Sequence, residues 1–215
     1  YYFFRIDLTS DKRFTLAPIS KEVMHSLDEP VFIHVYLDGE MPLGLKKMRQ
    51  SIIAMLDELE VNAKGKLKYL LLNPSEGSEQ KRDAMYRHLY AKGLQPLVVP
   101  ESDSEGGRPQ RMILHGALLS YSDREKAINF LINNPALSEE ENLSLAIQNL
   151  EFELVSAISL TSRTKKPKVA FIEGHGELDE YESGDMAREL SQYYSVERVE
   201  LNGDVGGLEE YAAVI

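Results

Sequence analysis

Acid, imidazole and glycine come together at one place in this chain, the segment Glu173-Gly174-His175-Gly176-Glu177. Carboxylates and an imidazole at a spacing of two residues could hold a polar ligand, move a proton or ligate a metal ion. The glycines would free backbone N–H groups for a ligand, or permit the backbone angles of a tight turn. The segment is therefore either a ligand-binding loop or a plain turn whose charges cap the next element or face water.

The residues before this segment favour a binding site. Residues 169–172 form an apolar run typical of a buried strand, and open α/β sheets bind ligands beyond the carboxyl ends of their strands. We therefore predict Glu173, His175 and Glu177 as candidate ligand-binding residues for an unknown small molecule. Three side chains on one short loop rarely converge on an ion without a fourth ligand, so we predict no metal site and no cofactor.

No other part of the sequence resembles a catalytic centre. The chain has no cysteine, which excludes disulfides, thiolate zinc sites and a Cys nucleophile. It contains neither a Gly-x-Ser-x-Gly elbow nor a phosphate-binding or dinucleotide-binding glycine motif. We predict no catalytic residues and a protein that is not an enzyme.

Composition limits the partners. The 215 residues carry a formal net charge of -11, which argues against nucleic acid, because phosphate neutralisation needs an excess of Lys and Arg. Hydrophobic residues make up 43% of the chain, enough for a packed core, while no run approaches the ~20 apolar residues of a spanning helix. The chain begins at Tyr1 and ends within an apolar run at Ile215, so we expect a fragment of a longer protein.

Hydrophobic periodicity predicts an α/β fold that starts with a thioredoxin-like unit over residues 1–135. The predicted order is β-α-β-α-β-β after a short helix, although no Cys-x-x-Cys motif follows the first strand. The predicted elements are a helix at 16–27, a strand at 31–37, a helix with inward Leu45, Met48, Ile52, Met55 and Leu59, a strand at 67–72, a helix capped by Ser78 with inward Met85 and Leu89, a strand at 97–99, and a hairpin of 112–121 with 126–131.

A connecting segment and a second unit follow. Ser138 and Glu141 form a capping box, and an apolar stripe continues to Thr161, which predicts one long helix of roughly 35 Å. We assign residues 136–165 to this helix and a basic joint. Residues 166–215 are then the start of a second, truncated α/β domain of the flavodoxin or amidotransferase type.

Several short motifs, in their order and spacing, resemble the extracytoplasmic part of the GldG family. This is the family of gliding-associated auxiliary proteins of ABC transporters, within a wider group of ABC-type transport system auxiliary domains. The similarity spans nearly all of the chain. The matching stretches are 4–9, 12–18, 27–31, 35–39, 73–76 and Gly174-His175-Gly176-Glu177.

The resemblance implies a Bacteroidetes-type protein held in the cytoplasmic membrane by helices outside these residues. Residues 1–215 would lie at the periplasmic face of the bacterial inner membrane and belong to a complex whose partner proteins are ABC-transporter permease and ATPase subunits. The same family is similar to glutamine-amidotransferase-like folds and to a domain of a ciliary intraflagellar-transport subunit. The amidotransferase nucleophile is a Cys, and this sequence has none.

These observations together predict a non-catalytic extracytoplasmic module of a membrane-anchored ABC-transporter auxiliary protein, linked to gliding motility or secretion. Two alternatives stay open at this point. One is a periplasmic solute-binding domain, which needs a cleft with apolar and aromatic walls. The other is a hydrolase or amidotransferase-like enzyme that uses the 173–177 loop.

Overall fold

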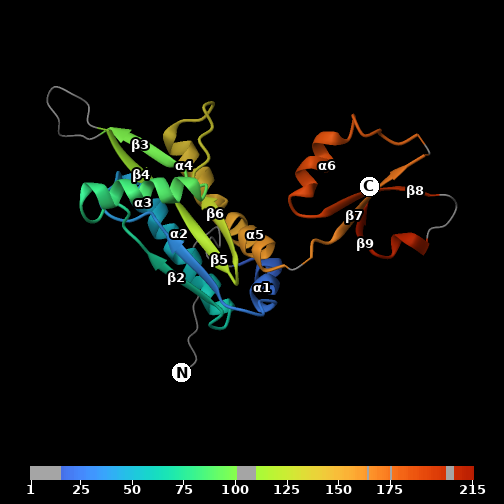
Figure 1. Ribbon diagram of the computed structural model, residues 1–215, viewed down its shortest axis with the longest axis horizontal. Helices are drawn as coiled ribbons and strands as arrows, with labels where there is room; N and C mark the ends of the chain where they lie inside the picture. The colour runs from blue at the N-terminus through green and yellow to red at the C-terminus, as the bar shows by residue number, and fades with distance from the viewer. Residues whose placement is uncertain (1–15, 101–109, 164, 175, 202–205) are drawn as a thin grey trace. The chain divides into compact units, whose positions relative to one another are not determined.

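Helices and strands both occur along the computed structural model, which describes residues 16–100, 110–163, 165–174, 176–201 and 206–215 (Figure 1). This mixture of helices and sheets confirms the predicted α/β class. Contacts between Cα atoms divide the chain into two units, Tyr1–Ser162 and Arg163–Ile215. The thioredoxin-like and flavodoxin-like assignments of these units stay predictions, as do the domain boundaries 1–135, 136–165 and 166–215.

A four-stranded sheet of order β2-β1-β5-β6 forms the centre of the first unit. Strand β1 pairs in parallel with β2 and antiparallel with β5, and β5 pairs antiparallel with β6. The strand bounds are Val31–Val35 for β1, Leu67–Leu71 for β2, Gly116–Tyr121 for β5 and Arg124–Asn129 for β6. A parallel pair needs a crossover connection, and the helix between β1 and β2 supplies it.

Alternation of side chains gives this sheet one strongly apolar face. Val31, Ile33 and Val35 of β1 are fully buried in the main core. The predicted stripe on α2 (Leu43–Asn62) belongs to the same core, and its five residues are all buried, as expected for an amphipathic helix. Residues of three further helices complete the core, from α1 (Pro18–His25), α4 (Glu139–Gln148) and α5 (Leu150–Ser162).

A smaller cluster covers part of the opposite face. Leu89 of α3 (Glu79–Ala91) is fully buried against Tyr36 and Leu118. Met85, predicted to point inward, is instead 42% exposed, because α3 meets the sheet along a narrower stripe than the sequence suggests. Phe32 of β1 is half exposed and Leu70 of β2 more so.

The predicted strand at 112–121 is wrong in extent. It consists of β4 (Gln110–Leu114) and β5, separated by the buried His115. Strand β3 (Pro96–Pro100) pairs with β4 in a separate two-stranded sheet. At Gly116 an added Cβ would lie 2.4 Å from the Ile128 carbonyl oxygen, so this close strand approach requires glycine. The apolar pattern runs through both strands and does not reveal the break.

The predicted single helix after Ser138 is also wrong, although its capping box is present. Helices α4 and α5 meet at an angle of 51°, and Asn149 is the C-cap of α4. The bend lets α4 pack on α2 while α5 packs on β5 and β6. Within the described residues no single helix is long and apolar enough to cross a membrane, while this bent pair passes the same test of length and composition.

The second unit is built on a three-stranded parallel sheet of order β8-β7-β9. Its elements are β7 (Lys168–Glu173), α6 (Gly184–Ser191), β8 (Ser195–Glu200), the 3₁₀ turn η1 (Gly206–Leu208) and β9 (Tyr211–Val214). Helix α6 connects two parallel strands, which is the βαβ arrangement predicted for this part of the chain. Strand β7 therefore lies in the middle and ends at the candidate loop.

Candidate functional site at the end of strand β7

The central strand of the second unit places Glu173 at its carboxyl end. Val169, Ala170 and Phe171 are buried, as expected for a strand paired on both edges. The parallel register sets Phe171 opposite Arg198 and Glu173 opposite Glu200. The sheet thus brings an arginine from β8 next to the acid that begins the predicted loop.

An ion pair holds the Glu173 carboxylate. Nη1 of Arg198 donates to Oε1 of Glu173 at 2.5 Å, and the two side chains are 22% and 35% exposed. The guanidinium carbon lies 5.6 Å from the centroid of the Phe171 ring, within the range of a cation–π contact. A charge-assisted hydrogen bond of this kind fixes both side chains.

Ser183 extends this contact. It is 4% exposed, and its Oγ accepts from Nη2 of Arg198 at 2.7 Å and donates to the Asp179 carbonyl oxygen at 2.6 Å. The Asp179 carboxylate accepts from the N–H groups of Tyr181 and Glu182 at 2.8 and 2.9 Å. This is an Asx-type turn, so Asp179 shapes the segment that leads into α6.

The three predicted ligand-binding residues have different outcomes. Glu173 points to Arg198, Glu177 is exposed, and His175 lies outside the described residues. Gly174 and Gly176 have φ angles of 102° and 97°, a left-handed conformation that glycine adopts readily. In the described parts of the chain no three His, Asp or Glu side chains are grouped so that they could hold a metal ion.

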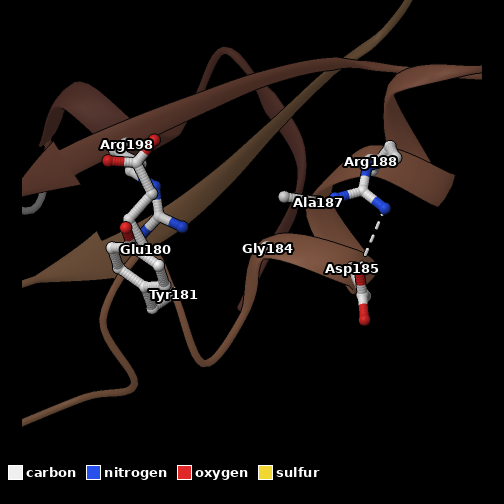
Figure 2. A pocket seen from close by; sticks show the side chains of 7 residues that line it. All are labelled: Glu180, Tyr181, Gly184, Asp185, Ala187, Arg188 and Arg198. Atoms are coloured by element: carbon white, nitrogen blue, oxygen red, sulfur yellow. Dashed lines mark ion pairs between the residues drawn. The ribbon is translucent and has the colours of Figure 1, made fainter.

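An open pocket of about 700 Å³ lies beside this ion pair. In Figure 2, Arg198, Glu180 and Tyr181 lie on one side of it, and Asp185 and Arg188 lie on the other. Nη1 of Arg188 is 3.0 Å from Oδ1 of Asp185, and both side chains are largely exposed. Gly184 and Ala187 of α6 complete the lining.

Sequence reasoning missed Arg198, Ser183 and the pocket. The ion pair joins residues 25 positions apart, and only the register of two parallel strands brings them together. A usable signal existed, because an arginine in the middle of a predicted strand needs an acidic partner where it is partly buried. The nearest acid on the preceding strand is Glu173.

A second polar cluster joins β7, β8 and β9 near the start of β7. Nζ of Lys168 lies 3.0 Å from Glu210 and 3.1 Å from Glu197, whose carboxylate also accepts from the Tyr211 hydroxyl at 2.7 Å. Hydrogen bonds to Glu210 and then Glu197 raise the pKa of Lys168. Hydrogen bonds from Tyr211 and then Lys168 lower the pKa of Glu197.

Fold and site together define a two-unit α/β protein with an arginine-centred polar cluster at the end of the central strand of its second unit. The chain belongs to the family described as domain of unknown function DUF7088, whose model matches residues 10–120. The matched residues lie in the first unit, so the pocket and the Glu173–Arg198 pair lie outside them. No curated protein and no solved structure matches the chain.

Proposed function

We propose that this chain is a non-catalytic extracytoplasmic module of a membrane-anchored ABC-transporter auxiliary protein, at the periplasmic face of a bacterial inner membrane. Its partners are the permease and ATPase subunits of a transporter that serves gliding motility or secretion, and it joins them by contact with the permease. The resemblance to the GldG family supports the transporter, the compartment and the membrane anchor. The side chains at the end of β7 support the absence of catalysis.

The Glu173–Arg198 pair is the observation that carries this proposal. A general base must lie within hydrogen-bond reach of the proton that it removes. The Glu173 carboxylate instead accepts from Arg198 at 2.5 Å, so this acid is already held by a charge-assisted hydrogen bond within the fold. Glu173 therefore has a structural role, and the hydrolase alternative loses one of the three residues on which it depends.

An apolar surface suited to protein contact lies on the first unit. We define the sheet patch as Phe32 and Leu70, which are 50% and 59% exposed. The register sets Phe32 opposite Lys68 and Leu70 opposite His34, so the two apolar side chains are diagonal neighbours on one face. Adjacent exposed apolar residues favour association, and we assign the permease contact to this patch.

Co-purification tests the proposal. The full-length protein would be affinity-tagged in its own organism, extracted in mild detergent, and its bound subunits quantified by mass spectrometry. We expect the ATPase and permease encoded beside it to elute in fixed proportion. Replacing both patch residues (Phe32→Ser with Leu70→Ser) should reduce this recovery by about tenfold or more, since loss of a central apolar contact has effects of that size.

Val61→Ser is the matched control, because Val61 is 69% exposed on α2, away from the sheet patch. This variant should retain full recovery of both subunits. Purification of the wild-type protein without the ATPase and permease would overturn the transporter assignment. Undiminished recovery with the double variant would overturn the assignment of the contact to this patch.

A further inference from the structure

The open pocket of the second unit has the features of a small-molecule site. Its volume of about 700 Å³ lies within the range of ligand pockets in proteins. Its wall combines charged groups of both signs with the ring of Tyr181 (Figure 2). The Tyr181 side chain is 97% exposed, so a bound molecule could cover an aromatic surface that the fold leaves open.

One of the charged groups is already fixed in position. Two nitrogen atoms of the Arg198 guanidinium donate to Glu173 and Ser183, and its plane is near the Phe171 ring. A guanidinium carries five N–H donors, so these two contacts leave capacity for an acceptor in the pocket. A donor that is held before the ligand arrives binds with a smaller loss of conformational entropy.

The charges of the lining identify the class of ligand. Arg188 and Arg198 are positive, and Glu180 and Asp185 are negative, so the lining has no formal net charge. Acidic residues outnumber basic ones two to one in residues 163–215, which disfavours a simple anion through the summed field. The two guanidiniums in turn disfavour a simple cation, whereas a molecule with both charges meets complementary groups.

We propose that this pocket binds a small zwitterion, either a free amino acid or a short peptide. The ligand spans the pocket: its carboxylate lies toward Arg188 on one side, and its ammonium group lies toward Glu180 on the other, beside the remaining donors of Arg198. This site is separate from the sheet patch and does not depend on the transporter assignment.

Nuclear magnetic resonance of the ¹⁵N-labelled 215-residue chain tests the proposal. The probes are L-alanine and L-alanyl-L-alanine, with propionate as the carboxylate-only probe and ethylamine as the ammonium-only probe. We expect amide shifts at Gly184, Ala187 and Arg198 with either zwitterion and not with the single-charge probes. A response to L-alanine indicates a site for a free amino acid, whereas a response to the dipeptide alone indicates a site for a peptide.

Two variants remove one charge from each side of the pocket. Arg188→Gln and Glu180→Gln should each weaken the binding of the responding zwitterion by about tenfold, the typical effect of losing a hydrogen bond to a charged group. Arg188 is largely exposed in its pair with Asp185, so the fold should survive, and the amide spectrum reports this directly. Arg87→Gln, at an exposed arginine of α3, is the matched control and should bind as the wild type does.

Three results would overturn the proposal. The first is that neither zwitterion causes amide shifts. The second is that propionate or ethylamine causes shifts equal to those of the zwitterions. The third is that both pocket variants bind with unchanged affinity.

Discussion

The two units of this protein rely on different interactions. The first unit has an extensive apolar core with fully buried side chains from strands on one side and helices on the other. In the second unit, the described residues contribute only Val169, Ala170 and Phe171 to the buried apolar set. Its strands are tied by polar clusters around Arg198 and Lys168. A small unit with a limited core thus depends more on hydrogen bonds and ion pairs, which makes its stability sensitive to pH and salt.

The largest expected effect is in the apolar core of the first unit. Ile52→Ala should lower the free energy of unfolding by about 2–5 kcal/mol, because it removes a fully buried side chain from α2 and leaves a cavity. Urea unfolding measures this change. The matched control Val61→Ala, at an exposed position of the same helix, should stay within about 0.5 kcal/mol. Equal effects at the two positions would contradict an apolar core as the main source of stability.

The next largest effect is in the second unit. Arg198→Met should lower its stability by about 1–3 kcal/mol, since Glu173 and Ser183 lose a partly buried donor. Hydrogen exchange of the β7 and β8 amides isolates this unit from the first. Arg188→Met is the control, because its ion pair with Asp185 is solvent-exposed and such pairs contribute little. If exchange rates rise equally in both variants, the Arg198 cluster is not what holds the strands.

The third prediction concerns the contribution of a helix cap to the stability of the first unit. Ser138→Ala should lower the free energy of unfolding by about 1 kcal/mol, because the Ser138 side chain accepts from the Glu141 N–H at the start of α4 and alanine has no acceptor to replace it. The comparison variant is Ser51→Ala, whose hydroxyl donates to the Lys47 carbonyl within α2 and which should be neutral or stabilising, since alanine has the higher helix propensity. A larger loss at Ser51 than at Ser138 would contradict the role of the capping box.

The smallest effect at neutral pH concerns a polar group inside the apolar unit. Burial lowers the pKa of His115 below its ordinary 6.5, and its Nδ1 accepts from the Leu131 N–H at 3.3 Å. The unfolded imidazole takes up a proton near pH 6.5, whereas the folded one does so only at lower pH. The stability contribution is therefore complete above pH 6.5 and is lost as the pH falls below that value.

Urea unfolding of the first unit from pH 7.5 to pH 5 checks this prediction. His115→Gln should flatten the loss of stability below pH 6.5, while the exposed His25→Gln should leave the wild-type dependence unchanged. A wild-type slope that survives in His115→Gln would assign the pH dependence to other groups.

Local patterns in the sequence correctly predicted the elements that pack against a single surface along their whole length. The stripe from Leu45 to Leu59 faces one core throughout, so a single period describes it. The capping box at Ser138 and Glu141 is likewise a property of four consecutive residues. These features need no knowledge of the rest of the fold.

Features set by tertiary contacts were not predictable in this way. The apolar stripe continues across Asn149, although α4 and α5 pack against different surfaces and diverge by 51°. The partner of Glu173 depends on the register of β7 with β8, which no local pattern encodes. The candidate segment was placed at the end of a buried strand, but its first acid, Glu173, is the last residue of β7 and its role depends on a residue 25 positions along the chain.

A measurement of turnover tests the non-catalytic role of this protein most directly. The purified chain and its His175→Ala variant would be assayed together against panels of amide, ester, phosphoester and glycoside substrates. Neither protein should hydrolyse any substrate above the rate in buffer. Turnover by the wild-type protein that is lost in His175→Ala would contradict a non-catalytic role for the loop after β7.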